Sequence, residues 1–132
     1  MSEPSGPSYS YAPQSQPITA DQERTWGTIS HVVPLVAMVL SAGTLGFVGS
    51  LVIYLIYKDK GPFVRAHAAN SLNIQIITAV FLIISIPLMF VLIGFVTYAI
   101  ALVVAFVLHL IGAIKAYNGD WWNPPLTPRL VR

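Results

Sequence analysis

Charged residues are confined to three short parts of this sequence, and the two long stretches between them contain none. Residues 25–57 and residues 66–114 lack Asp, Glu, Lys and Arg altogether. A soluble helical domain needs charged side chains along its outward faces, whereas the core of a bilayer penalises charge and tolerates apolar surface on every side. The pattern therefore predicts an all-α integral membrane protein.

The overall composition agrees with this prediction and excludes several kinds of function. The chain is 55% hydrophobic and 9% charged, against about 25% charged residues in an average globular protein. It has no cysteine, which excludes disulfides, thiolate metal sites and cysteine catalysis. The net charge of +2 is small and no long basic run exists, so we expect no nucleic-acid partner.

The first twenty residues differ in character from the rest of the chain. They contain four Pro and five Ser, and such a segment cannot bury enough apolar surface to fold. We therefore predict a disordered cytoplasmic tail over residues 1–20 and one helical membrane domain over residues 21–132.

Four transmembrane or re-entrant helices, forming two hairpins, are expected in this domain. Their expected ranges are 21–41, 46–57, 62–90 and 96–117. Pro34 predicts a kink in the first helix. The second spans roughly 18 Å, which is short for a hydrocarbon core of about 30 Å, so the first hairpin is either re-entrant or thins the bilayer locally. The uncharged residues 92–95 are expected to form the second turn.

The distribution of basic residues predicts the orientation of the chain in the membrane. Lys and Arg occur in residues 58–65 and 115–132 and are absent from both uncharged turns. Because cytoplasmic loops collect basic residues, both termini are expected in the cytoplasm. The alternative is a single span over residues 35–57, with residues 22–34 lying flat on the surface and the N-terminus outside.

Three histidines stand out, because ionisable groups in membrane segments are costly and often functional. His31, His67 and His109 would lie at loosely similar depth on the cytoplasmic side of four helices. They could bind a metal or form a proton-sensitive cluster. The plainer alternative, which we favour, is that each neutral ring bonds a neighbouring helix.

The third expected helix carries a polar stripe, which includes His67. The stripe and the amides beside it consist of Asn70, Ser71, Asn73, Gln75, Thr78 and Ser85. Such a stripe can line a hydrated pathway or hold helices together through hydrogen bonds, and the second is the favoured interpretation. Small residues at four-residue spacing around Gly112 and Gly49 indicate either a dimer face or close packing within the monomer.

Residues 58–75, which form the loop after the second helix and the start of the third, are expected to pack against residues 118–129 on the cytoplasmic face. The positions assigned to this face and to the membrane interface are Lys58, Asp59, Arg65, Lys115, Asn118, Trp121, Trp122 and Arg129. The two tryptophans are expected at the headgroup level, and Arg129 near lipid phosphates or the 58–65 loop.

Several of these segments resemble the Tic-twenty-like family of small bacterial membrane proteins, a family of unknown function distantly like a chloroplast inner-envelope translocon subunit. The matching pieces are Lys58-Asp59, Pro62-Phe63-Val64, His67, Ala69, Leu72-Asn73, Gln75, Ile114-Lys115-Ala116, Asn118-Gly119, Pro125-Leu126-Thr127 and Arg129. Arg65 and Ala68 depart from the family pattern. The resemblance implies a helical fold in the plasma membrane.

No set of residues in the sequence predicts catalysis. There is no nucleophile with a base, no carboxylate pair and no phosphate-binding loop. We therefore expect a non-enzymatic protein without cofactor or bound metal, which acts in the bilayer by association with itself or with a larger membrane complex. The alternative is an oligomeric channel or translocon-like component, and a site built on the three histidines is the third hypothesis.

Overall fold

The computed structural model describes residues 17–132, and most of the predicted tail, residues 1–16, lies outside the described residues. Four α-helices and one short 3-10 helix follow one another: α1 (Ala20–Leu40), α2 (Gly46–Tyr57), α3 (Pro62–Leu88), η1 (Met89–Val91) and α4 (Ile93–Tyr117). No strand occurs among these residues. The expected all-helical fold and the number of α-helices are confirmed.

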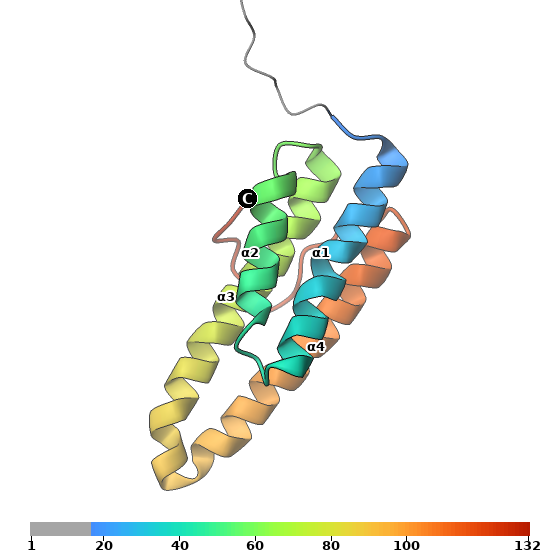
Figure 1. The fold of residues 1–132 in the computed structure, drawn as a ribbon. Coiled ribbons are helices and arrows are strands. Elements are labelled where there is room, and N and C mark those ends of the chain that lie inside the picture. Colours follow the sequence, from blue (N-terminus) through green and yellow to red (C-terminus); the bar gives the residue numbers. More distant parts are fainter. Residues whose placement is uncertain (1–16) are drawn as a thin grey trace, which may run out of the picture.

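The four helices form two antiparallel hairpins of unequal length (Figure 1). The turn between α1 and α2 lies part-way along α3 and α4, and the α3–α4 hairpin continues alone beyond it. The difference follows from helix length: α2 has 12 residues and α3 has 27, or roughly 18 Å and 40 Å at 1.5 Å per residue. The molecule therefore has a four-helix part and a two-helix extension.

Local sequence explains where the helices begin. Thr19 caps α1 through a capping box, in which its hydroxyl accepts from the Gln22 amide and the Gln22 side chain accepts from the Thr19 amide. Pro62 opens α3, where a missing N–H costs nothing. The Glu23 carboxylate of α1 accepts from the next two amides, Phe63 at 2.8 Å and Val64 at 3.0 Å. Through these two hydrogen bonds the Glu23 carboxylate links the start of α3 to α1.

The turn between α3 and α4 comes earlier in the chain than the sequence predicts, because α3 ends at Leu88 and not at residue 90. We expected residues 92–95 as the turn, but α4 already begins at Ile93. The chain reverses through η1 and Leu92, which has a left-handed φ of 67°. Gly94 lies inside α4. A Cβ at this position would be only 2.1 Å from the Ser85 carbonyl oxygen, so no larger residue fits. The glycine permits close helix contact and does not form the turn.

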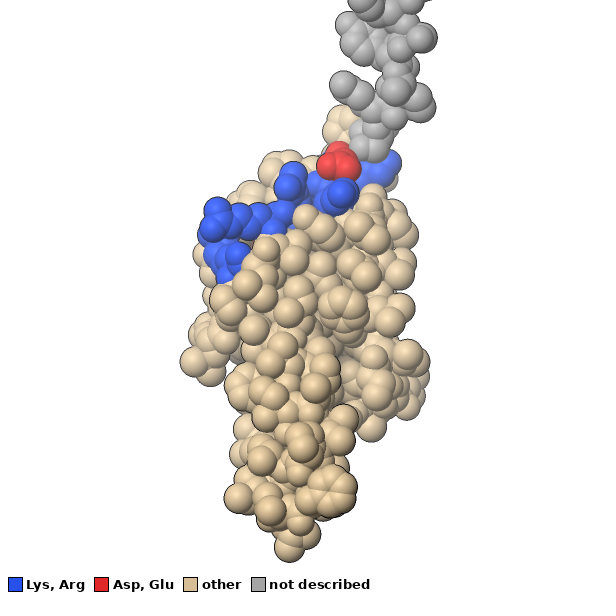
Figure 2. Space-filling view, turned by 90° about the vertical axis from the view of Figure 1, so that its left-hand side faces the viewer, with Lys and Arg blue, Asp and Glu red and all other residues tan. Residues whose placement is uncertain are grey.

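Charged side chains gather at the end of the molecule where α1 and α3 begin and where α2 and α4 end. Figure 2 shows Lys and Arg over this end, which we call the charged end, while the rest of the same face shows no charged residue. Most apolar side chains of α3 and α4 point outward. In the most apolar 18-residue stretch of each of these segments, only 28% and 22% of the residues are buried. Among the described residues, the buried set combines thirteen hydrophobic residues with eleven polar ones, the three histidines among them.

Candidate functional site: a buried histidine chain and the strap that covers it

The three predicted histidines meet in the centre of the four-helix part. They come from α1, α3 and α4, and the side chain of each is 0% exposed. The Nδ1 atoms of His31 and His109 are 3.3 Å apart, and Nε2 of His31 lies 3.4 Å from Nδ1 of His67. The rings are therefore joined in series, with His31 in the middle.

Each end of this series has a further polar partner. Nε2 of His67 lies 2.8 Å from the backbone oxygen of Asp120, and Nε2 of His109 lies 2.7 Å from the side-chain nitrogen of Gln75. We call the whole series, from the Asp120 carbonyl through His67, His31 and His109 to Gln75, the histidine chain.

The Asp120 oxygen fixes the direction of every hydrogen bond in the neutral chain. A carbonyl only accepts, so His67 must carry its proton on Nε2 and must accept at Nδ1. His31 then donates from Nε2 and accepts at Nδ1, and His109 donates from Nδ1 and accepts from Gln75 at Nε2. Geometry therefore assigns one tautomer to each neutral ring.

Two glycines make room for the histidine chain. A Cβ on Gly112 of α4 would lie 2.3 Å from Cε1 of His31, and one on Gly46 of α2 would lie 2.5 Å from Oε1 of Gln75. The small residues singled out in the sequence thus serve packing within the monomer at these positions. They bring the helices close enough for the rings to meet.

The serial arrangement does not suit a single metal ion. A metal centre needs one ligand atom from each ring directed at one point, whereas the two nitrogens of His31 face different neighbours. Over the part of the chain that the structure describes, no group of three or more His, Asp, Glu or Cys is placed to hold a metal. The geometry instead supports hydrogen bonding from ring to ring.

A second polar cluster, the serine node, joins three helices beside the histidine chain. Pro34 has no N–H, so the carbonyl of Ser30, four residues earlier in α1, lacks its helical donor. The Ser71 hydroxyl of α3 donates to that carbonyl at 2.5 Å, and Ser50 of α2 lies 2.8 Å from the same hydroxyl. α1 remains continuous through Pro34 because a neighbouring helix replaces the missing bond.

The segment after α4, residues 118–132, lies across the polar face of α3, and we call it the strap. Asn73 bonds both backbone groups of Val131: its side-chain nitrogen donates to the carbonyl at 2.9 Å and its oxygen accepts from the amide at 2.7 Å. Asn70 donates to the Trp122 carbonyl, and the Arg65 guanidinium donates to the Arg132 carbonyl. The expected contact between these two segments is present.

The remaining positions predicted at the membrane interface differ in exposure and in the groups they contact. Trp121 is 63% exposed and makes an edge contact with the Phe63 ring at 5.2 Å. Trp122 is half-buried, with its ring 6.0 Å from that of His31, so the strap closes over the histidine chain. Lys115 pairs with Asp120 at 3.8 Å. Lys58 and Asp59 follow α2 and Asn118 follows α4, at the charged end, and Arg129 is an exposed residue of the strap.

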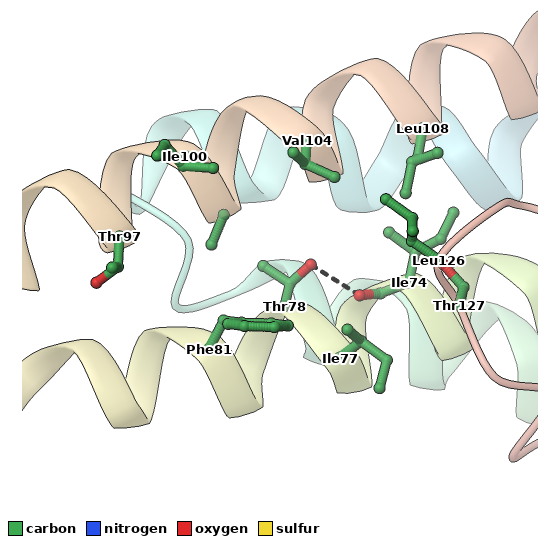
Figure 3. A pocket seen from close by; sticks show the side chains of 11 residues that line it. Ile74, Ile77, Thr78, Phe81, Thr97, Ile100, Val104, Leu108, Leu126 and Thr127 are labelled. Carbon is green, nitrogen blue, oxygen red and sulfur yellow. Dashed lines mark hydrogen bonds between the residues drawn. The ribbon is translucent and has the colours of Figure 1, made fainter.

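Thr78, which belongs to the polar stripe predicted on the third helix, lies outside both polar clusters. Its hydroxyl donates to the Ile74 carbonyl within α3 at 2.7 Å. It lines an apolar groove between α3 and α4, with a volume of about 410 Å³, and Leu126 and Thr127 of the strap close one end of the groove (Figure 3).

The sequence did not predict three groups that accept hydrogen bonds at these sites, because two are backbone carbonyls and one is a carboxylate far away in the sequence. The Glu23 carboxylate, the Asp120 carbonyl and the Ser30 carbonyl received no role. Only Pro34 carried a usable signal, because a proline within a helix always leaves one carbonyl without its donor.

Together, the fold and the site define an all-helical protein with a largely apolar exterior and many polar side chains buried between its helices. Two helical segments, Pro62–Val91 and Ile93–Tyr117, are long and apolar enough to cross a membrane. Residues 22–131 match the MamF/MmsF family, described as the magnetosome magnetite crystal formation protein family. The chain belongs to this family. Comparison with curated proteins found no match, and comparison with solved structures found none either.

The family assignment corrects the Tic-twenty-like resemblance, which was wrong. The pieces that carried it include the helix start at Pro62 and the helix end at Asn118-Gly119. Such pieces serve general needs of short helical hairpins, because a helix needs a start and a stop in any family.

Proposed function

We propose that this chain is an integral protein of the magnetosome membrane and takes part in magnetite crystal formation from within the bilayer. The observation that carries the proposal is the outward apolar surface of α3 and α4. In the most apolar 18-residue stretch of each helical segment, only 28% and 22% of the residues are buried. A core helix of a soluble protein would be mostly buried. The family supplies the process.

The proposed location is the magnetosome membrane in place of the plasma membrane expected from the sequence, and the charged end faces the cytoplasm. The Lys and Arg side chains at that end support this orientation (Figure 2), because basic residues remain on the cytoplasmic side. The α3–α4 turn then points toward the compartment in which the crystal grows. With four helices in two hairpins, the orientation we propose has both termini on the cytoplasmic side.

We infer an action through association with membrane proteins, with no enzymatic step and no direct binding of the mineral. Iron ions at an oxide surface favour carboxylate and other oxygen ligands, and residues 66–114 contain no carboxylate. The outward faces of α3 and α4 offer apolar contact to a second copy or to another membrane helix. The polar side chains of α3 are engaged inside the molecule, which weighs against the oligomeric channel.

The test is complementation of a strain that lacks the gene, with crystal size measured by electron microscopy. We expect the wild-type chain to remain with purified magnetosomes after an alkaline carbonate wash and to restore crystal size. A variant with Ile83→Lys and Val103→Lys places charges on outward faces that are 66% and 62% exposed. It should lose both properties, whereas Ile83→Leu with Val103→Leu should keep them. Release of the wild-type chain by carbonate would refute the proposal.

A further inference from the structure

We propose that the histidine chain is a proton-transfer path through the four-helix part of the molecule. Three imidazoles from α1, α3 and α4 lie in hydrogen-bonding contact, and all three are fully buried. An imidazole can accept a proton on one nitrogen while it releases another from the second. Rings joined in series through opposite nitrogens therefore have the arrangement that ring-to-ring proton transfer requires.

The histidine chain extends from the charged end to the turn between α1 and α2. Its first member, the Asp120 carbonyl, belongs to an exposed residue of the strap. Its last member, Gln75, lies against Gly46, the first residue of α2 after that turn. His67 and Gln75 are eight residues apart in α3, or roughly 12 Å along the helix. The path thus runs from the charged end to the level of the α1–α2 turn, which lies part-way along α3 and α4 (Figure 1).

The transfer can be written bond by bond. Gln75 swings off Nε2 of His109, and a hydronium ion that enters at the α1–α2 turn gives this nitrogen its proton; the rotated Gln75 amide then accepts from the new N–H through its oxygen. The Nδ1–H bond of His109 breaks as an Nδ1–H bond forms on His31. The Nε2–H bond of His31 breaks as an Nδ1–H bond forms on His67, and His67 releases its Nε2 proton to water beside Asp120.

One proton enters and one leaves, with no change in the number of electrons. Each transfer leaves every ring with its proton on the opposite nitrogen, so the rings must reorient before the next transfer in the same direction. Gly112 of α4 allows His31, the middle ring, to occupy this position.

The groups that face the rings are consistent with a path for protons and inconsistent with a buried ion pair. Phe63 and Trp122 contact the rings of His67 and His31. The carboxylate of Asp120, which belongs to the strap beside His67, is paired with Lys115 at 3.8 Å. Among the described residues no carboxylate bonds His31 or His109, so an extra proton on either ring is not held by an anion and can pass toward His67.

The reaction class that would supply protons is the hydrolysis and precipitation of iron ions as an oxide, which releases protons from water. This link, and this link alone, rests on the proposed function. With the charged end toward the cytoplasm, protons that reach the α1–α2 turn from the side of the crystal would be led to the cytoplasm. Ring-to-ring transfer itself depends only on the geometry of the histidine chain.

The test is proton flux into vesicles that contain the purified full-length chain and a trapped pH-sensitive dye. A potassium gradient with valinomycin supplies the driving force. We expect flux above that of protein-free vesicles, and its loss in His31→Gln, because glutamine can bond both neighbours but cannot pass a proton. The matched control is Thr78→Val, a buried residue outside the path, which should retain wild-type flux.

A second measurement needs no variant. Nitrogen-15 NMR of labelled histidine in the wild-type chain should show His109 protonated on Nδ1 and the other two rings protonated on Nε2. Flux equal to that of protein-free vesicles, unchanged flux in His31→Gln, or a different set of tautomers would overturn the proposal. The vesicles contain no iron, so a negative result rejects the proton path and leaves the proposed function to its own test.

Discussion

The serine node leads to a prediction about how two substitutions combine. In the wild-type chain the Ser30 carbonyl depends on the Ser71 hydroxyl, because Pro34 offers it no N–H. Ser71→Ala removes this donor and also removes the acceptor for the Ser50 hydroxyl. Two buried polar groups then lose a partner at one position.

The magnitude follows from these groups. Leaving a buried polar group without a partner costs about 1–3 kcal/mol, so Ser71→Ala should lower the free energy of unfolding by at least that amount. In a Pro34→Ala background the new backbone N–H of residue 34 can donate to the Ser30 carbonyl. The cost of Ser71→Ala should then fall by about 1 kcal/mol, which lies within the coupling energies measured for residues that share a partner.

The assay is a double-mutant cycle on the free energy of unfolding in detergent micelles, measured by circular dichroism as a denaturing detergent is added. All four chains, wild type, both single variants and the double variant, are compared under one condition. Thr78→Val provides the background control, since its hydroxyl bonds within its own helix. An equal cost of Ser71→Ala in both backgrounds would refute the reasoning, because it would mean that Pro34 does not create the demand for Ser71.

Two further predictions concern the fit of the rings and the position of the strap. Gly112→Ala should destabilise the protein by about 1–3 kcal/mol through overpacking against His31, whereas Gly27→Ala, whose new Cβ would lie 3.4 Å from its nearest neighbour, should change the unfolding free energy little. Cysteines placed at Asn73 and Val131 should be joined within one chain by a short thiol cross-linker in native membranes. Either cysteine alone should give no such product, and a failure of the pair to react would contradict the strap.

The main elements of the fold could be predicted from the sequence because charge and proline act locally. The uncharged stretches and the glycine-rich turn placed α1 and α2 to within one residue at either end. The start of α4 could not be placed, since Gly94 in sequence looks like a turn residue. Glycine is needed at position 94 because a Cβ there would lie 2.1 Å from the Ser85 carbonyl oxygen of α3. That contact exists only in the folded chain.

The candidate site could be predicted as a set of residues but not as an arrangement. Depth along each helix indicated that the three histidines would lie at a similar level. The rotation of each helix decides which nitrogen faces which neighbour, and this rotation depends on contacts such as Gly112 against His31. The acceptor that fixes the tautomers is a backbone carbonyl of the strap, and no side-chain motif reports it.

The central claim, a chain embedded in the magnetosome membrane with its charged end outward, can be tested with single cysteines in this cysteine-free sequence. One is placed at Arg129 on the exposed strap and the other at Phe90, which is 92% exposed near the α3–α4 turn. Intact purified magnetosomes are treated with a membrane-impermeant maleimide. The account predicts labelling at position 129 at once and at position 90 only after detergent is added. Equal labelling of position 90 in intact magnetosomes would contradict it.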